Sequence, residues 1–221
     1  GVKVDAVIHF AAYAYVGESV TNPIKYYKNN LVETINLLEA IVTENKRRAL
    51  LNKVSNIPII FSSTCATYGN PIDKFIRENT HQKPINPYGR SKLMIEQVIS
   101  DFEIAYGLSS VIFRYFNAAG ADPLTDIGED HTPETHLIPL AIDAVNGKIE
   151  YLNIYGDDYN TYDGTCIRDF IHVSDIADAH VLGLEKVLSQ PNQYIYNLGT
   201  GIGTSVYDIV KEIERQTSKK L

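Results

Sequence analysis

Tyr88 and Lys92 stand four positions apart in the run Asn86-Pro87-Tyr88-Gly89-Arg90-Ser91-Lys92. On a helix, residues at this spacing lie on the same face, so a phenol would stand beside an ammonium group. A nearby cation favours the phenolate, which predicts that the pKa of Tyr88 falls from about 10 towards neutrality and that Tyr88 acts as a base. Thr64, in the hydroxyl-rich residues 61–69 upstream, offers a hydroxyl that would orient a substrate alcohol.

Each of these residues also has an ordinary structural explanation. Tyr and Lys at this spacing can form an exposed pair, and Thr64 can cap a strand end. By itself Tyr-x-x-x-Lys is a weak motif. Pro87 at the predicted start of the helix and the Ser/Thr-rich strand end before it favour a catalytic interpretation of the three residues together.

The surrounding sequence alternates between short apolar runs and longer segments with helical spacing. Continuous apolar strands separated by long helices indicate an α/β protein with a parallel sheet covered on both faces. Residues 118–136 are rich in Gly, Pro, Asp and Thr and predict a loop that leaves the sheet, and residues 44–56 predict a surface insertion. The expected strands are 4–10, 57–62, 110–116, 151–155, 170–172 and 194–198, and the expected helices are 22–44, 88–106, 137–145, 174–188 and one starting at Ser205 with a capping box.

Length and composition narrow the class of protein. The 221 residues suffice for one or two domains, and 20 basic against 27 acidic residues give a net charge of −7. This balance argues against a nucleic-acid or membrane-surface partner, and the basic run Lys46-Arg47-Arg48 predicts a solvated helix end. No apolar run is long enough to span a membrane, and we expect no signal peptide. The two cysteines, Cys65 and Cys166, fit a reduced, cytoplasmic protein.

Other polar and small residues fall at predicted strand ends. Phe10-Ala11-Ala12 closes the first strand, where small residues permit close approach of a cofactor or simply tight packing. Asn29-Asn30 lies inside a predicted helix and is either solvated or ties neighbouring loops or a cofactor. Asn117 places an amide at the end of the third strand, and the forked donors of Arg168 suit a diphosphate.

Two further motifs have weaker support. His131 and His136, with Glu129, Asp130 and Glu134, offer metal-ligating groups, but a polar loop explains them better and we predict no metal site. The glycine-rich residues 199–203 follow a strand and precede a helix, as a phosphate-binding loop does. No second βα unit with an acidic ribose contact follows them, so we predict a tight turn.

Taken in order, the motifs resemble those of UDP-glucose 4-epimerases, which are extended short-chain dehydrogenases/reductases. The resemblance covers essentially the whole chain and implies a Rossmann-like doubly wound parallel sheet with a smaller α/β substrate-binding domain. Residues 1–117 would form the NAD-binding domain, with a partial return at 156–190, and residues 118–221 would mainly bind the nucleotide sugar. The motifs are Val7-Ile8-His9-Phe10-Ala11-Ala12, Val16-Gly17-Glu18-Ser19, Tyr26-Tyr27-Lys28-Asn29-Asn30, Phe61-Ser62-Ser63-Thr64, Tyr88-x-x-x-Lys92, Arg114-Tyr115-Phe116-Asn117, Gly128-Glu129-Asp130, His136-Leu137-Ile138-Pro139, Asp163-Gly164-Thr165, Arg168-Asp169-Phe170-Ile171-His172-Val173 and Tyr196-Asn197-Leu198-Gly199.

The activity that this resemblance implies is reversible epimerisation of a UDP-hexose at C4 with tightly bound NAD, as in galactose metabolism. Tyr88 would remove the proton from the 4-hydroxyl while C4 passes a hydride to the nicotinamide, and Thr64 would hydrogen-bond that hydroxyl. Lys92 would hold the NAD ribose and, together with the positive nicotinamide, lower the pKa of Tyr88. The 4-keto sugar would turn over in the pocket and take the hydride back on its other face.

The resemblance also assigns residues to the two ligands and implies a cytoplasmic homodimer. NAD would contact Phe10, Ala11, Ala12, Asn29, Thr64, Tyr88, Lys92 and Phe116. The nucleotide sugar would contact Thr64, Asn117, His136, Leu137, Asn153, Ile154, Tyr155 and Arg168.

The chain departs from the family pattern at its two ends. The first βαβ unit, with its glycine-rich phosphate loop, would lie before Gly1, and about a fifth of the substrate domain would lie after Leu221. We therefore expect these 221 residues to be part of a longer enzyme, and by themselves to bind NAD poorly and to be inactive. Some family members also have a lysine where this chain has Ala14.

Three alternative functions share this fold. A nucleotide-sugar 4,6-dehydratase typically has Asp-Glu directly after the threonine, whereas Cys65-Ala66 follows Thr64 here. A reductase would release its nicotinamide cofactor, which the sequence does not exclude. A non-catalytic NAD-sensing module is the alternative of a different class, and the joint presence of Tyr88, Lys92 and Thr64 argues against it.

Overall fold

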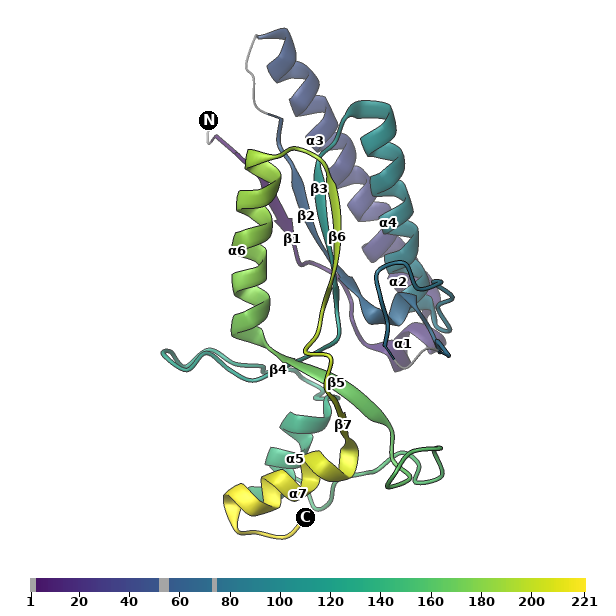
Figure 1. Ribbon diagram of the computed structural model, residues 1–221, viewed down its shortest axis with the longest axis vertical. Coiled ribbons are helices and arrows are strands. Elements are labelled where there is room, and N and C mark those ends of the chain that lie inside the picture. The colour runs from purple at the N-terminus through teal and green to yellow at the C-terminus, as the bar shows by residue number, and fades with distance from the viewer. Residues whose placement is uncertain (1–2, 52–55, 73–74) are drawn as a thin grey trace. The chain divides into compact units, whose positions relative to one another are not determined.

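The computed structural model describes residues 3–51, 56–72 and 75–221 (Figure 1). The chain divides into two compact units, the first made of Gly1–Tyr115 and Ala177–Leu198, the second of Phe116–Ile176 and Gly199–Leu221. Each unit is built on its own sheet.

The sheet of the first unit has four parallel strands in the order β1 (Val7–His9), β2 (Ile59–Thr64), β3 (Ser110–Tyr115) and β6 (Gln193–Leu198). Thr64 is in register with Tyr115, and Tyr115 with Leu198. Because all four strands run the same way, their carboxyl ends meet at one edge of the sheet. This edge is where the sequence places Thr64, and the predicted parallel α/β architecture is confirmed.

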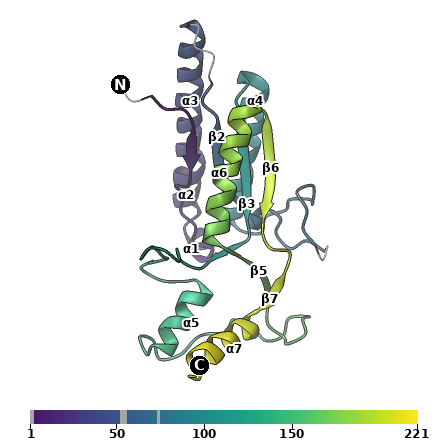
Figure 2. The same ribbon diagram turned by 60° about the vertical axis from the view of Figure 1, so that its left-hand side comes forward.

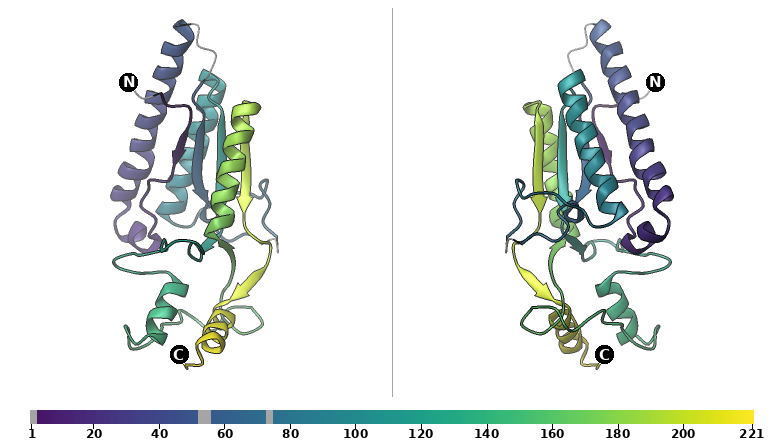
Figure 3. Two further views of the ribbon diagram at one scale, coloured as in Figure 1. Left: turned by 90° about the vertical axis from the view of Figure 1, so that its left-hand side faces the viewer. Right: turned by 90° about the vertical axis from the view of Figure 1, so that its right-hand side faces the viewer.

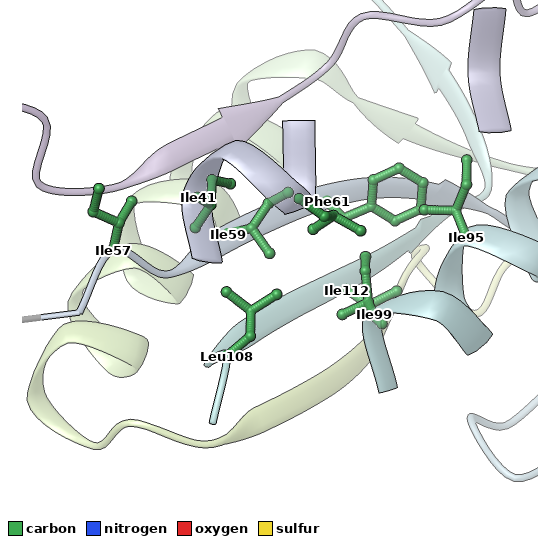
Figure 4. Close-up of a cluster of buried hydrophobic side chains, with 9 residues drawn as sticks. Ile41, Ile57, Ile59, Phe61, Ile95, Ile99, Leu108 and Ile112 are labelled. Atoms are coloured by element: carbon green, nitrogen blue, oxygen red, sulfur yellow. The ribbon is translucent and has the colours of Figure 1, made fainter. Parts of the chain in front are cut away.

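Helices cover both faces of this sheet, as the apolar strands require. Figure 3 shows α3 (Glu33–Leu50) and α4 (Pro87–Tyr106) on one face and α6 (Val173–Ser189) on the other. Successive residues of β2 serve opposite faces, since side chains alternate along a strand. Ile59 and Phe61 pack in a cluster with Leu38, Ile41, Ile95 and Ile99 of α3 and α4 (Figure 4). Ile60 packs in a second cluster with Val111, Phe113 and Val187.

The helix predicted over residues 22–44 is interrupted. The chain forms α1 (Val16–Thr21), α2 (Pro23–Tyr26) and a π-helical segment, Tyr27–Val32, before α3 begins. A π-helix inserts an extra residue per turn and is often found at functional sites. Here it turns Asn30 inward, where its side chain accepts from the Tyr13 amide and donates to the Tyr13 carbonyl, both at 2.9 Å. Asn30 therefore ties the chain that follows β1 to the helix.

Of the predictions for residues 44–56, the helix end near residue 44 and the exposure of Arg48 are wrong. α3 continues to Leu50, and residues 52–55 lie outside the described residues. Arg48 is buried instead of solvated, because its guanidinium donates to Glu44 at 3.0 Å and to the Val4 carbonyl at 2.7 Å. Its neighbours Lys46 and Arg47 are exposed near the end of α3, as predicted, and Arg47 pairs with Glu44.

The start of α4 is set by local chemistry. The Asn86 side chain accepts from the Gly89 amide at 2.8 Å, and Pro87 occupies the first helical position, which needs no backbone donor. At the other end, Gly107 closes the helix with φ of 67°. Tyr88 therefore lies in the first turn of α4 and Lys92 one turn later.

The second unit is the smaller one and contains a three-stranded sheet (Figure 2). In it β4 (Asn117–Ala119) pairs parallel with β5 (Ile167–His172), which pairs antiparallel with β7 (Gly203–Ser205). The helices are α5 (Leu137–Val145) and α7 (Val206–Thr217), and the predicted cap of α7 is confirmed, with the Asp208 amide donating to Ser205 Oγ at 3.0 Å.

Two expectations for this unit are wrong. Residues 151–155 form no strand, since their backbone has no neighbouring strand with which to pair among the described residues. The short strand β4 stands at the start of the predicted loop, and β7 begins at Gly203, the last residue of the predicted turn, because three residues are too few to give an alternating pattern.

Candidate active site

Helix α4 meets the end of β2 through three consecutive turns. Tyr88, Lys92 and Glu96 lie at spacings of four along the helix and contact Thr64, the Ser62 carbonyl and Ser63 respectively. Tyr88 and Thr64 are joined by a side-chain hydrogen bond, and Lys92 Nζ donates to the Ser62 carbonyl at 2.6 Å. The structure thus brings the three predicted catalytic residues together within the first unit, while their catalytic roles remain a prediction.

Lys92 is a buried amine, with 3% of its surface exposed. Its Nζ lies 4.7 Å from the centre of the Phe61 ring, an arrangement that attracts a cation. Burial lowers the pKa of Lys92 from 10.5 to about 7, and the Glu96 carboxylate one turn away acts in the opposite direction. The amine therefore changes its charge near neutral pH.

The predicted lowering of the Tyr88 pKa is wrong for this structure. Burial of the phenol raises the pKa of Tyr88 to about 12, and the hydrogen bond with Thr64 only partly opposes this shift. The physical reason is that burial disfavours the phenolate, while the Lys92 amine is engaged by the Ser62 carbonyl. The i, i+4 spacing places the two residues on one face but does not bring their charges into contact.

A buried ionic network beside this group is missing from the sequence prediction. Glu96 and Arg114, 5% and 3% exposed, form an ion pair with Arg114 Nη2 at 2.7 Å from Glu96 Oε2. Ser63 Oγ donates to Glu96 Oε1, and Arg114 Nη1 donates to the Tyr68 hydroxyl at 2.7 Å. Glu96 carries a signal that sequence reasoning overlooked, since it is an acidic residue on the apolar face of α4, four positions after Lys92.

The other strand ends of this sheet edge carry aromatic and small residues. Phe10 is 58% exposed and its ring centre lies 4.8 Å from that of the buried His180. The Tyr115 hydroxyl hydrogen-bonds His180 Nε2 at 2.7 Å, and burial raises the pKa of Tyr115. Ala11 is exposed and Ala12 half-buried. Exposed apolar side chains, Phe10 and Ala11, therefore stand at the end of β1 on the same sheet edge as Thr64.

Asn29, which is predicted to contact the cofactor, has a hydrogen-bond partner within the protein. The half-buried Asn29 donates from Nδ2 to Asn30 Oδ1 at 2.9 Å. Of the two interpretations of Asn29-Asn30, Asn30 fits the one in which the side chain links neighbouring segments. A cofactor contact by Asn29 stays a prediction.

The residues predicted to bind a nucleotide sugar lie in the second unit, apart from Thr64, as does the predicted NAD contact Phe116. Asn117 opens β4 opposite Phe170, and Arg168 lies two residues earlier on the neighbouring β5. Arg168 is exposed, and its guanidinium donates to the adjacent Ile167 carbonyl at 2.9 Å. His136 caps α5 and Leu137 begins it, while Asn153, Ile154 and Tyr155 lie on an unpaired extended segment.

The His and Glu residues of the predicted polar loop gather closely. Ligating atoms of Glu129, His131, Glu134 and His136 all lie within 4.8 Å of one another. Glu129 Oε1 contacts Nδ1 of both imidazoles, and Glu134 Oε1 accepts from the Thr135 and His136 amides. These contacts give each carboxylate a partner in the loop itself. The absence of a metal here stays a prediction.

The glycine-rich turn at 199–203 is occupied by a carboxylate of the protein. Asp169 accepts from the Thr200 amide at 2.8 Å and the Gly201 amide at 2.7 Å, and a Cβ on Gly199 would meet its Oδ2 at 2.8 Å. Gly201 adopts φ of 74°, a conformation that glycine enters at little cost. The donors of a phosphate-binding loop are thus used internally, and the predicted tight turn is confirmed.

With this geometry in view, comparison with known families is decisive. The model of the NAD dependent epimerase/dehydratase family matches residues 1–199. The chain belongs to this family. Among the described residues, no helix has the length and apolar character needed to cross a membrane.

Within the family, the similar proteins confirm the resemblance inferred from the motifs. The chain is 48% identical over 217 residues to a UDP-glucose 4-epimerase of Rhizobium leguminosarum bv. trifolii, covering 98% of this chain and 63% of that protein. A UDP-glucose 4-epimerase structure from Brucella ovis in complex with NAD is 53% identical with a TM-score of 0.87, covering 96% of this chain and 62% of that one. One from Bifidobacterium longum with NAD+ and UDP is 39% identical with a TM-score of 0.86, covering 98% and 62%. The chain thus spans about three fifths of the length of these relatives.

Proposed function

We propose that this protein interconverts UDP-glucose and UDP-galactose at the sugar C4 through a 4-keto intermediate, with bound NAD. The observation that carries the proposal is the Thr64–Tyr88–Lys92 group at the carboxyl edge of a parallel sheet, in a chain of the epimerase/dehydratase family. Relatives named UDP-glucose 4-epimerase support this choice of sugar and reaction.

The residues at this edge fit a nicotinamide dinucleotide. The exposed Phe10 and Ala11 offer apolar side chains against which a ring of NAD could pack. Small side chains here would let a ribose of NAD come close to the protein backbone. Lys92, Asn29 and the Tyr88 hydroxyl supply polar contacts, to which Phe116 would add an apolar one. When bound, NAD supplies a hydride acceptor that also returns the hydride, so no second substrate is consumed.

The protein's own residues would handle the proton. Thr64 orients the sugar 4-hydroxyl and Tyr88 takes its proton as the C–H bond at C4 breaks, then gives the proton back when the bond is remade. With a pKa of about 12, the phenol alone is a poor base at neutral pH. Tyr88 therefore needs a positive charge close to its oxygen, and Lys92 in its protonated form is the cation that the chain provides on the same helix face.

The second unit would hold the nucleotide sugar, through Asn117, His136, Leu137, Asn153, Ile154, Tyr155 and Arg168. Arg168 is exposed and its forked donors would clamp the diphosphate. We place the enzyme in galactose metabolism in the cytoplasm, acting as a homodimer without nucleic-acid or membrane partners. That these 221 residues by themselves bind NAD poorly and are inactive stays a prediction, which equilibrium dialysis with NAD and the conversion assay below check.

The alternative of a 4,6-dehydratase is not favoured. Elimination of water needs an acid/base pair, and here Thr64 is followed by Cys65 and Ala66 in a short turn, where the Ala66 amide donates to Thr64 Oγ1 at 3.1 Å. The non-catalytic alternative is disfavoured because a binding module has no need for a tyrosine hydrogen-bonded to Thr64.

The test is proton NMR of UDP-glucose mixed with the NAD-loaded full-length enzyme, of which we expect these 221 residues to be a part, without added NADH. We expect the anomeric signal of UDP-galactose to grow to equilibrium. Tyr88→Phe should slow turnover by about 10²–10⁴-fold without unfolding the protein, because it removes the base. Tyr106→Phe, an exposed tyrosine at the end of the same helix, is the matched control and should keep full activity. An unchanged spectrum with the wild type would refute the proposed reaction, and unchanged turnover in Tyr88→Phe would refute the role of Tyr88.

A further inference from the structure

We propose that Glu96 is a positioning residue for the Thr64–Tyr88–Lys92 group, fixing the end of β2 through Ser63 and placing a negative charge one helical turn from Lys92. This inference rests on the proposed function for its catalytic consequence. The contacts from which it is argued all lie within the first unit.

Three side chains on one face of helix α4 contact three consecutive residues of strand β2. Tyr88, Lys92 and Glu96 repeat every four residues, so they share one face of α4. They contact Thr64, Ser62 and Ser63, which are three consecutive residues of β2. Two of these turns carry the proposed chemistry. The third, Glu96, is the one that anchors the strand without touching the reacting atoms.

Glu96 is itself fixed by four donors. Oε1 accepts from Ser63 Oγ and, at 3.2 Å, from Arg114 Nε, while Oε2 accepts from Arg114 Nη2 at 2.7 Å and from Gln82 Nε2 at 3.1 Å. A buried carboxylate with this many donors has little freedom to move. The position of Ser63, and of Thr64 next to it, is therefore set by α4 and by β3, which carries Arg114.

The same carboxylate acts on Lys92. Desolvation alone would leave the buried amine neutral, and Glu96 works against it by favouring the ammonium form. The other titratable groups around this helix face are His9 on β1, Cys65 and Tyr68 after β2, Tyr88 on α4, and Arg114 and Tyr115 on β3. Burial lowers the pKa of His9, and repulsion by the Lys92 ammonium lowers it further. Glu96 supplies the negative charge that raises the pKa of Lys92 against the effect of burial.

Two variants separate positioning from charge. Ser63→Ala cuts the link between Glu96 and β2 but leaves the Glu96–Arg114 ion pair intact. Displacement of a reacting group by about 1 Å can cost about 100-fold, so we expect kcat for the UDP-sugar conversion to fall at least tenfold with little change in KM. Glu96→Gln keeps the shape and removes the charge, so we expect the pKa of Lys92 to fall by at least half a unit.

The pKa of Lys92 is measured by NMR of 15Nζ-labelled lysine in the folded protein, which needs no catalysis. Glu96→Asp keeps the charge but shortens the side chain, so it should preserve the Lys92 pKa while lowering kcat. If Glu96→Gln does not fold, Ser63→Ala and Glu96→Asp still test the positioning. Asp101→Asn, an exposed carboxylate on the same helix, is the control and should change neither value.

The proposal is overturned if Ser63→Ala lowers only the stability to urea while kcat of the folded enzyme is unchanged, or if Glu96→Gln leaves the Lys92 pKa where it is. A wild type that converts no UDP-sugar would instead refute the proposed function. The Lys92 titration would still decide whether Glu96 acts on the amine.

Discussion

Replacement of the buried Lys92 by methionine should change stability in a way that depends on pH. Burial holds the pKa of Lys92 at about 7, against 10.5 for an exposed lysine. The unfolded chain therefore binds one more proton than the folded protein between about pH 7 and pH 10.5. Where the unfolded state binds more protons, stability rises with pH, so the wild type should gain stability across this window. Below pH 7 both states carry the proton and the full cost of the buried charge remains.

The size of the effect follows from the two pKa values. Their difference, 10.5 minus about 7, is about 3.5 pKa units. At about 1.4 kcal/mol per unit, burial of the charged amine costs at most about 5 kcal/mol of folding stability. The variant loses the hydrogen bond to the Ser62 carbonyl and the contact with the Phe61 ring, which offset about 1–3 kcal/mol. We expect Lys92→Met to be more stable than the wild type by about 2 kcal/mol at pH 6 and this gap to narrow by about 2 kcal/mol between pH 7 and pH 9.

Urea unfolding followed by circular dichroism at pH 6, 7, 8 and 9 measures this gap, and the difference between the two proteins cancels the titration of groups that they share. Lys28→Met, at an exposed lysine of the same unit, is the control and should run parallel to the wild type. A gap for Lys92→Met that stays constant over the whole range would refute the claim that burial displaces the Lys92 pKa.

Three further substitutions probe the scaffold of the site by urea unfolding. Arg114→Met leaves the Glu96 carboxylate buried without its ion-pair partner and should cost about 3–5 kcal/mol, most of it recovered in the double variant with Glu96→Met; equal losses in both would contradict this. Asn86→Ala removes the cap of α4 and should cost about 1 kcal/mol, whereas no loss would show that the cap is dispensable. Gly89→Ala would place a Cβ 2.6 Å from the Ala66 carbonyl oxygen and should cost about 1–3 kcal/mol, an expectation that wild-type stability would exclude.

Local patterns in the sequence were sufficient for the scaffold of the first unit. The apolar runs at β2 and β3 and the stripes on α3 and α4 predict a parallel sheet with helices on both faces, because burial on two sides leaves no room for polar alternation. Asn86 and Pro87 mark the start of α4 for the same local reason. Thr64, Tyr88 and Lys92 follow from this scaffold, since strand ends and helix turns have fixed geometry.

The charges and polar contacts around those residues depended on the tertiary structure. Spacing alone predicted that Lys92 would lower the pKa of Tyr88. In the structure burial raises the pKa of Tyr88, and the Lys92 amine donates to the Ser62 carbonyl. Desolvation is set by every element that packs around a group, and no single segment of sequence contains that information.

The same reason explains the buried residues that the sequence did not reveal. The Glu96–Arg114 pair joins a helix to a strand 18 positions away, and Arg48 folds back on Val4. The sequence by itself determined which elements form and which reactive side chains stand at their ends. Only the tertiary structure decided which of those side chains are buried, which are paired and what charge they carry, because burial and pairing arise between segments that are distant along the chain.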